Sequence, residues 1–505
     1  MVARVNTIAP VGFEGALVEV ESDIKKGLPS IQIVGMGTKS VDEAKERVRS
    51  AIGNSLLEFP TRKITINLAP AALIKDGALY DLPIALSILV SSGQLYQSQV
   101  DGAIFAGELA LDGSLRPIKG ALNVAQAAKE HGFDKLYLPS QNAAQAELID
   151  GVEVIGVKNL KDIFLHLKKE KIITTTQSTS TPPQEVAYTG SILDDIHGQE
   201  QAKRALIIAA AGRHNILFTG PPGAGKTMLA KTLTSLLPKL TREEQIEVTK
   251  IHSLAGEISG EIITSRPFRS PHHTTSATAI IGGGTKPKPG EISLSHLGVL
   301  FLDEIPEFPR SVLESLRQPL EDRQISVSRT AAKVTYPADF MLVATMNPCP
   351  CGNLGNPAKE CTCTTNQILN YQKKLSGPLL DRIDLIVSVS RIPNDIILKT
   401  NKASTKTQQD SAIFLLNKSK EIQNNRYKSS HIYNSSLSSR DVSAKLKLSD
   451  EASSLLTLAG DKLGLSARSF FKIIKVAQTI ADLEGVDCIE KQHISEALQY
   501  RGQTS

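Results

Sequence analysis

The sequence has no long hydrophobic run and little net charge. Its longest apolar run lies within LPIALSILV (82–90), about half of the roughly 18 residues that a membrane span needs. No membrane span and no membrane partner are therefore expected. The N-terminus has no basic region followed by an apolar core, which excludes a secretory signal and predicts a cytoplasmic protein. Lys and Arg number 57 against 52 Asp and Glu, so the overall charge indicates no partner.

Cysteine is also scarce. Four of the five cysteines lie in Cys349–Cys363, a distribution that excludes a disulfide framework and favours either a metal site or plain local structure. The chain has 505 residues, of which 41% are hydrophobic and 22% charged. At this length and composition we expect about three globular domains.

The pattern along the chain predicts an α/β protein. Strand-like runs alternate with helical patterns before KKEKIITTTQSTSTPPQEVAYTG (168–190), which has the composition of a linker. Three later apolar runs, NILFTG, VLFLDE and FMLVATMNP, are typical of a parallel sheet. From Arg391 to Asp450 we count eleven basic and five acidic residues. In the last 55 residues, apolar residues recur three and four positions apart, which indicates helices. The predicted boundaries are an α/β domain at 1–167, a linker at 168–190, a nucleotide-binding α/β core at 191–392, a basic polar connector at 393–448 and a helical domain at 449–505.

A phosphate-binding loop follows the first of these strands. GPPGAGKT matches G-x-x-x-x-G-K-[ST] between an apolar strand and a helical pattern, which is the context that the motif requires. A chance glycine turn is the alternative, and the matching context disfavours it. The motif predicts binding of ATP with Mg²⁺. The predicted nucleotide-binding residues are Gly220, Pro221, Pro222, Gly223, Ala224, Gly225, Lys226 and Thr227.

Polar residues that suit ATP hydrolysis end the next two strands. GVLFLDE ends in Asp303, suited to magnesium together with Thr227, and Glu304, suited to polarising water. Asn347 follows the third strand, where its amide would orient water. Two solvated acids at a strand end are common alone but improbable beside a phosphate loop. Arg382 and Arg468 are weaker candidates, because most surface arginines are simply solvated.

Two Cys-x-Cys pairs lie close together in the sequence. Cys349 and Cys351 are separated by nine residues from Cys361 and Cys363. Four thiolates can enclose a structural Zn²⁺, although C-x-x-C is the commoner spacing. Reduced thiols without metal remain the alternative. A catalytic zinc is disfavoured because four cysteines leave no open coordination position.

Two basic segments are candidate DNA contacts. Residues 265–290 contain no acidic residue, and a following pair of alternating strands predicts a hairpin with basic residues near its tip. Such loops suit contacts to the DNA backbone. On composition alone, ordinary solvated surface is the commoner explanation of both segments. The candidate residues are Arg266, Arg269, Lys286 and Lys288 in the first segment and Arg329 and Lys333 in the hairpin.

Several segments together resemble a known family. GPPGAGKT, GVLFLDE, ATMNP, LLDRIDL and LSARSFFKIIKVAQTIA, in this order, resemble the magnesium-chelatase-like AAA+ ATPases, and RPFRSPHHTTSATAIIGGG and NPCPCG resemble the ComM/YifB family among them. The resemblance implies an AAA+ core with a C-terminal helical lid, Asn347 as sensor 1, Arg382 as the arginine finger and Arg468 as sensor 2. It further implies a homo-hexamer that acts as a DNA helicase in branch migration during natural transformation, with recombinase machinery as a candidate partner.

The N-terminal domain is similar to another family. IKDGALYDLPIALSIL and GELALDGSLRPIKGAL resemble the proteolytic domain of Lon, which uses a Ser–Lys dyad. Residues 71–86 contain no serine, although Lys119 lies in the second motif. We therefore expect a non-proteolytic scaffold. The alternatives for the whole chain are an ATPase motor for magnesium-chelatase-type metal insertion, a Lon-like protease, and a nucleotide-dependent scaffold, which Glu304 disfavours.

Overall fold

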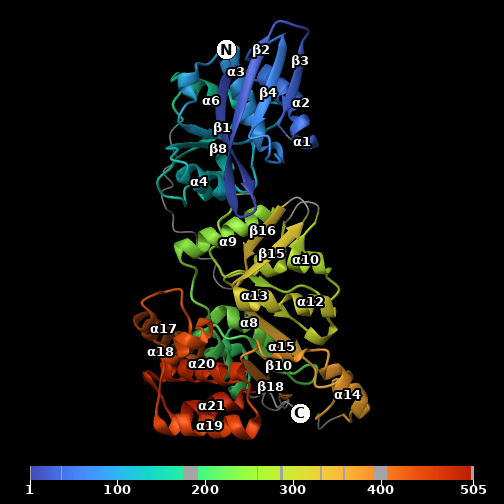
Figure 1. Ribbon diagram of the computed structural model, residues 1–505, viewed down its shortest axis with the longest axis vertical. Coiled ribbons are helices and arrows are strands. Elements are labelled where there is room, and N and C mark those ends of the chain that lie inside the picture. Colours follow the sequence, from blue (N-terminus) through green and yellow to red (C-terminus); the bar gives the residue numbers. More distant parts are fainter. Residues whose placement is uncertain are drawn as a thin grey trace.

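The computed structural model describes residues 2–35, 37–173, 191–258, 260–284, 288–329, 332–355, 359–391 and 407–501. Figure 1 shows an N-terminal α/β domain, a central α/β core and a C-terminal group of helices, arranged along the long axis of the molecule. Residues 174–190 of the predicted linker lie outside the described residues. Within the described ranges, no helix combines the length and the apolar character needed to cross a membrane.

A seven-stranded mixed sheet forms the N-terminal domain, in the order β3-β4-β2-β1-β5-β8-β9. β2 pairs antiparallel with both β1 and β4, and the other neighbours are parallel. Buried residues alternate with less buried ones along β4, as expected for a strand with one face on the core. The strands are β1 (Ala3–Val11), β2 (Glu14–Lys25), β3 (Ser30–Val34), β4 (Lys63–Ala69), β5 (Ala103–Phe105), β8 (Lys135–Pro139) and β9 (Glu153–Val157), with a small hairpin of β6 (Glu108–Leu109) and β7 (Leu115–Arg116). The helices are α1 (Lys39–Asp42), α2 (Ala44–Asn54), α3 (Asp81–Ser91), α4 (Ala121–Glu130), α5 (Ala143–Ala146) and α6 (Leu160–Leu167).

The longest apolar run of the sequence is a core helix of this domain. α3 packs against β1 and β2, and all its residues from Asp81 to Val90 are buried. At its start, Arg47 Nε lies 2.7 Å from the carboxylate of Asp81. Burial raises the pKa of Asp81 to about 6, although Arg47 acts in the opposite direction. The hydrophobic character of 82–90 therefore comes from burial in the domain core.

Five parallel strands form the central core, in the order β11-β14-β17-β10-β18. β14 and β17 are buried throughout, because helices cover both faces of a parallel sheet. The strands are β10 (Ile216–Thr219), β11 (Phe268–Arg269), β14 (Val299–Leu302), β17 (Met341–Met346) and β18 (Leu385–Ser388). The helices are α7 (Glu200–Gly212), α8 (Lys226–Leu236), α9 (Arg242–Ala255), α10 (Ala277–Ile281), α11 (Glu291–Leu294), α12 (Arg310–Ser315), α13 (Arg317–Asp322), α14 (Thr365–Gln372) and α15 (Gly377–Leu380). Two hairpins project from it, β12 (Gly282–Gly283) with β13 (Lys288–Pro289), and β15 (Gln324–Arg329) with β16 (Ala332–Pro337).

The C-terminal helices begin inside the segment predicted as a polar connector. The described residues resume at 407, and α17 packs against α7 and α20. Its contact with the core is partly polar, since the buried Gln423 donates from Nε2 to the carbonyl oxygen of Ala211 at 3.1 Å. Residues 407–445 are thus largely helical and share a core with 450–499. The elements are α17 (Thr407–Tyr427), α18 (Ser439–Lys445), α19 (Asp450–Leu463), α20 (Ala467–Glu484) and α21 (Lys491–Gln499), with a short parallel pair of β19 (Lys447–Leu448) and β20 (Cys488–Ile489).

The N-terminal domain rests on the central core through α4 and α9 (Figure 1). The backbone N–H of Gly120 donates to Ser253 Oγ at 3.0 Å. Lys250 Nζ donates to Gln126 Oε1 at 2.8 Å and lies 4.1 Å from the centroid of the Phe13 ring. The two parts therefore contact each other through backbone and side-chain polar groups that are largely buried.

Candidate nucleotide site

The phosphate loop connects β10 to α8, which begins at Lys226. Gly223 and Gly225 have φ of 75° and 85°, a left-handed backbone that glycine adopts without steric cost. At Gly220 a Cβ would lie 2.1 Å from the carbonyl oxygen of Val389, so no side chain fits there. The loop therefore presents a helix N-terminus, where backbone N–H groups stabilise an anion.

Lys226 extends along this loop. Its Nζ donates to the carbonyl oxygens of Gly220 at 2.6 Å and Pro221 at 3.1 Å, and to Asn347 Oδ1 at 3.0 Å. Burial lowers the pKa of Lys226, while two nearby carboxylates act in the opposite direction. The oxygens of the β and γ phosphates are acceptors of the same kind, so this ammonium group fits a nucleotide triphosphate.

A hydroxyl and a carboxylate lie next to the loop, where magnesium would be held. Thr227 Oγ1 donates to Asp303 Oδ2 at 3.3 Å, and Thr345 Oγ1 donates to Asp303 Oδ1 at 2.5 Å. A P-loop hydroxyl and an acidic strand end are the protein groups that hold Mg²⁺ in ATPases of this kind. The predicted pair, Thr227 and Asp303, therefore lies together and fits the ion.

Glu304 and Asn347 are also brought together. Asn347 Nδ2 donates to Glu304 Oε1 at 3.2 Å. Glu304 has a φ of 50°, costly for a residue with a side chain, and its backbone N–H donates to Thr345 Oγ1 at 2.9 Å. Sequence reasoning missed Thr345, whose only signal is a polar residue within the apolar strand MLVATM. Thr345 therefore holds the Asp303 carboxylate and the backbone of Glu304.

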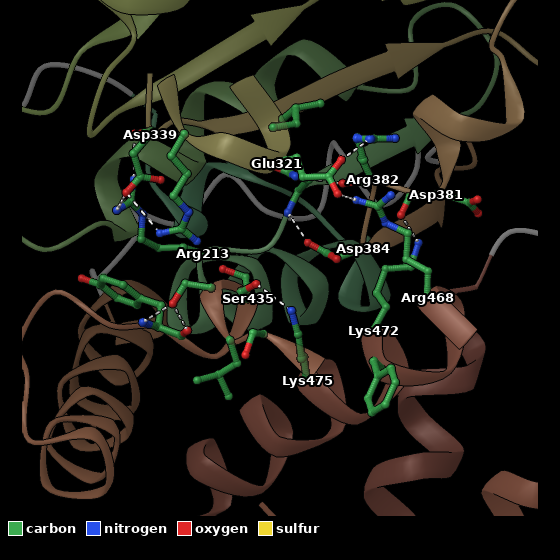
Figure 2. Close-up of a pocket in the computed structure, with 18 of the residues that line it drawn as sticks. Arg213, Glu321, Asp339, Asp381, Arg382, Asp384, Ser435, Arg468, Lys472 and Lys475 are labelled. Atoms are coloured by element: carbon green, nitrogen blue, oxygen red, sulfur yellow. Dashed lines mark hydrogen bonds and ion pairs between the residues drawn. The ribbon is translucent and has the colours of Figure 1, made fainter. Parts of the chain in front are cut away.

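Arg382 and Arg468 meet each other around Glu321 instead of lying at this phosphate loop (Figure 2). Arg382 forms an ion pair with Glu321 and donates to the carbonyl oxygen of Arg317 at 3.1 Å. Arg468 lies 3.4 Å from the same carboxylate. Although partial burial opposes it, the two guanidinium groups lower the pKa of Glu321. Sequence reasoning missed Glu321, since only the fold places α13 beside these arginines.

The two arginines line a cavity of about 690 Å³ between the core and the C-terminal helices. Lys472 and Lys475 of α20 also line it (Figure 2). Among the described residues, those that line this cavity include none from 220–227. The structure thus brings together the loop, Asp303, Glu304 and Asn347, but places the two arginines in a separate cavity.

The four clustered cysteines also come together. Their sulfur atoms all lie within 4.8 Å of one another, and this group can hold a metal ion. Backbone N–H groups of Asn353 and then Thr362 lower the pKa of the Cys351 thiol to about 5. The fifth cysteine, Cys488, lies apart in β20.

Both arginines of the first basic segment form ion pairs. The Arg266 side chain is 7% exposed and lies 2.9 Å from Glu244. Arg269 pairs with Glu257 at 3.0 Å and with Glu291 at 2.7 Å. These arginines therefore have structural partners, and their DNA contacts stay a prediction.

Lys288 is exposed in β13, and Lys286 lies outside the described residues. The predicted hairpin is confirmed in the backbone: β15 and β16 pair antiparallel, with Arg329 opposite Ala332 and Lys333 opposite Ser328. Both basic residues are near the end of the hairpin, as the sequence predicts.

The Lon-like segments contribute to contacts within the molecule. Lys119 lies beside Gly256 of the core, because a Cβ on that glycine would lie 2.6 Å from the lysine Nζ. Lys119 therefore lies at the contact between the N-terminal domain and the core. The absence of serine from residues 71–86 keeps the expectation of a non-proteolytic domain.

A phosphate loop, an acidic strand end and an asparagine that contacts both, all on a parallel sheet, are the features of a P-loop ATPase. Family models described as magnesium chelatase, subunit ChlI; subunit ChlI of Mg-chelatase; and magnesium chelatase, subunit ChlI C-terminal match residues 192–397, 20–142 and 415–501. The chain is 43% identical over 503 residues to the competence protein ComM of Haemophilus influenzae, covering 99% of this chain and 97% of that protein. It is also 43% identical over 499 residues to YifB of Escherichia coli, covering 98% and 96%. The chain therefore belongs to the ComM/YifB family of magnesium-chelatase-like AAA+ ATPases.

A partial similarity accompanies these matches. Lon protease 2 of Bacillus subtilis is 26% identical over 183 residues, covering 32% of this chain and 32% of that protein. The chain thus has a partial similarity to Lon protease.

Proposed function

We propose that this protein is an ATP-driven, hexameric DNA helicase or translocase that promotes branch migration of recombination intermediates during natural transformation. The observation that carries the proposal is that the residues expected at the ATP site lie in two separate places within one chain. Lys226, Glu304 and Asn347 form one hydrogen-bonded set, whereas Arg382 and Arg468 meet at Glu321 in another cavity. A site completed by a neighbouring subunit accounts for both.

The ATP site supplies the chemistry of the proposal. Lys226 would bind the β and γ phosphates, and Thr227 with Asp303 would hold Mg²⁺, which would supply neutralisation of charge at the transferred phosphoryl group. Glu304 accepts a proton from the attacking water, and Asn347 orients that water and reports on the γ phosphate. Arg382 from a neighbouring subunit stabilises the charge that develops on the phosphoryl group, and Arg468 adds to this stabilisation.

A mixing experiment tests the action of Arg382 between subunits. Glu304→Gln and Arg382→Ala are each expected to abolish most ATP hydrolysis. In a mixed ring, an intact Glu304 on one subunit can face an intact Arg382 on its neighbour, so the mixture is expected to regain activity. A mixture as inactive as the separate variants would contradict the shared site.

The DNA part of the proposal rests on basic groups outside the ATP site. The printed name of the Haemophilus relative is a competence protein, and the exposed Lys288 and the hairpin with Arg329 and Lys333 offer groups that suit DNA phosphates. Lys288→Ala is expected to reduce the slope of log DNA affinity against log salt concentration by about 1, the amount that corresponds to one phosphate contact. Lys445→Ala is a matched control, because that exposed lysine pairs with Asp441 at 2.9 Å.

The other parts of the proposal follow from the family. The C-terminal helices act as the lid of the ATPase, and the N-terminal domain is a non-proteolytic scaffold. A cytoplasmic location and contact with recombinase machinery complete the proposal. The location and the partner can be tested independently of ATP hydrolysis, the location by imaging the protein in cells and the partner by co-purification.

A second candidate is an ATPase motor for magnesium-chelatase-type metal insertion, which the descriptions of the matching family models favour. That function predicts ATP turnover that ignores DNA and responds to tetrapyrrole-bearing partners. The near full-length similarity to a competence protein favours the DNA motor. Turnover with and without duplex DNA separates the two.

A further inference from the structure

Four thiols lie at the distances of a mononuclear metal site. The sulfur atoms of Cys349, Cys351 and Cys361 are 3.4 to 3.6 Å apart, and Cys363 completes a group within 4.8 Å. A tetrahedral zinc ion with Zn–S bonds of about 2.3 Å places its four sulfurs about 3.8 Å apart. The observed spacing needs only small movements to admit one ion.

The loop around the thiols is shaped for such a site. Gly352 and Gly355 both have a φ of 76°, so two left-handed positions turn the backbone beside the first cysteine pair. The backbone N–H of Leu354 donates to Cys349 Sγ at 3.3 Å. N–H groups that point at sulfur stabilise thiolates and orient them toward a metal ion.

The same loop lies directly on the phosphate loop. A Cβ on Gly352 would be 2.6 Å from Pro222 Cδ, so the two loops are in close contact. Cys349 is two residues beyond Asn347, whose Oδ1 accepts from Lys226 Nζ at 3.0 Å. Anything that fixes the cysteine loop therefore also fixes the sensing asparagine and one wall of the ATP site.

We propose that Cys349, Cys351, Cys361 and Cys363 bind one structural zinc ion, which holds the cysteine loop against the phosphate loop and thereby positions Asn347. Four thiolates fill a tetrahedral zinc, so the ion has no open position and takes no part in hydrolysis. Its effect on ATP turnover is one of positioning, and this second part rests on the proposed ATPase function.

Metal content of the purified full-length protein tests the site itself. Elemental analysis is expected to find about one zinc per chain, and cobalt loading is expected to give the absorption bands of a tetrahedral tetrathiolate. A Cys361→Ser, Cys363→Ser variant should lose the metal. Cys488→Ser is the matched control and should retain it, because this cysteine lies outside the cluster. The zinc site would be overturned if wild-type protein purified in the presence of zinc contained no zinc and gave no cobalt bands. It would also be overturned if the protein contained iron in place of zinc, or if the folded double variant retained zinc.

Reversible removal of zinc from wild-type protein tests the positioning role without relying on a variant that folds. Displacement of an active-site group by about 1 Å costs on the order of 100-fold in rate. We expect extraction of zinc with a mercurial and chelator to lower kcat about 10- to 100-fold and thiol plus zinc to restore it. In an Asn347→Ala variant, extraction of zinc should lower kcat little further, because the group that zinc positions is already absent. An unchanged kcat in zinc-free protein would overturn the positioning role, whereas zinc without any ATP hydrolysis would contradict the proposed function and leave the metal site standing.

Discussion

Glu304→Gln replaces the carboxylate beside the phosphate loop by a neutral amide of the same size. Asn347 Nδ2 donates to Glu304 Oε1 at 3.2 Å, and glutamine still offers a carbonyl oxygen to this donor. The backbone N–H of residue 304 keeps its bond to Thr345 Oγ1, which is 2.9 Å long. The substitution therefore removes the ability to accept a proton and changes little else in the site.

The expected loss of activity can be calculated because the substitution removes only the general-base role of Glu304. General-base catalysis contributes about 10²- to 10⁴-fold to a rate, which is about 3 to 5 kcal/mol of transition-state stabilisation. We expect kcat for ATP hydrolysis to fall by that factor. Affinity for ATP is expected to change by less than about threefold, because the lost interaction is made only in the transition state.

Phosphate release and titration with a fluorescent ATP analogue measure the two quantities separately. Glu307→Gln is the matched control, since Glu307 forms an exposed ion pair with Lys374 at 3.3 Å, worth about 0–1 kcal/mol. It should leave both turnover and binding unchanged. A Glu304→Gln protein that hydrolyses ATP within about threefold of wild type would refute the role given to Glu304.

Three further predictions concern binding, stability and pH. Gly220→Ala places a Cβ 2.1 Å from a backbone carbonyl oxygen and is expected to abolish binding of the fluorescent nucleotide, whereas Gly53→Ala, where a Cβ meets nothing within 4 Å, should leave it intact. Arg426→Ala removes the partner, at 2.7 Å, of the fully buried Asp482, and we expect unfolding by denaturant to show a loss of about 3–5 kcal/mol. Burial lowers the pKa of Lys250 from 10.5 to about 8, so between these values the folded protein binds fewer protons than the unfolded chain and stability rises with pH. The unfolding midpoint of wild type minus that of Lys250→Met should increase across this window, and a flat difference would contradict the burial of that ammonium group.

The groups that the sequence predicts well depend on local backbone. The loop around Gly223 and Gly225 is set by its own glycines and by the strand and helix on either side, so the motif contains the information. Asp303 and Asn347 follow directly from the ends of buried parallel strands. Thr345 is different, because its role depends on hydrogen bonds to Asp303 and Glu304, which directly follow the neighbouring strand β14.

Long-range packing explains what the sequence did not show. Glu321 of α13 meets Arg382, which follows α15, only because the fold brings together two residues that are 61 positions apart in the chain. The sequence makes the basic residues of the first loop candidate DNA contacts, yet Arg266 forms an ion pair with Glu244 of α9. Charge counted along a segment does not reveal such partners.

The helix α17 shows a third reason. Its buried residues include Gln409, Ser419 and Gln423, which make hydrogen bonds where an apolar stripe would be expected. Periodicity of hydrophobic residues is then too weak to distinguish this helix from a polar connector.

The central claim is that ATP hydrolysis moves DNA. The most direct measurement follows ATP turnover and the migration of a mobile four-way junction in the same reaction, for wild type and Glu304→Gln, with single-stranded and duplex DNA beside the junction. The account predicts that DNA raises turnover and that only the wild-type protein, with ATP, resolves the junction. Turnover indifferent to DNA, together with a junction that does not move, would contradict it.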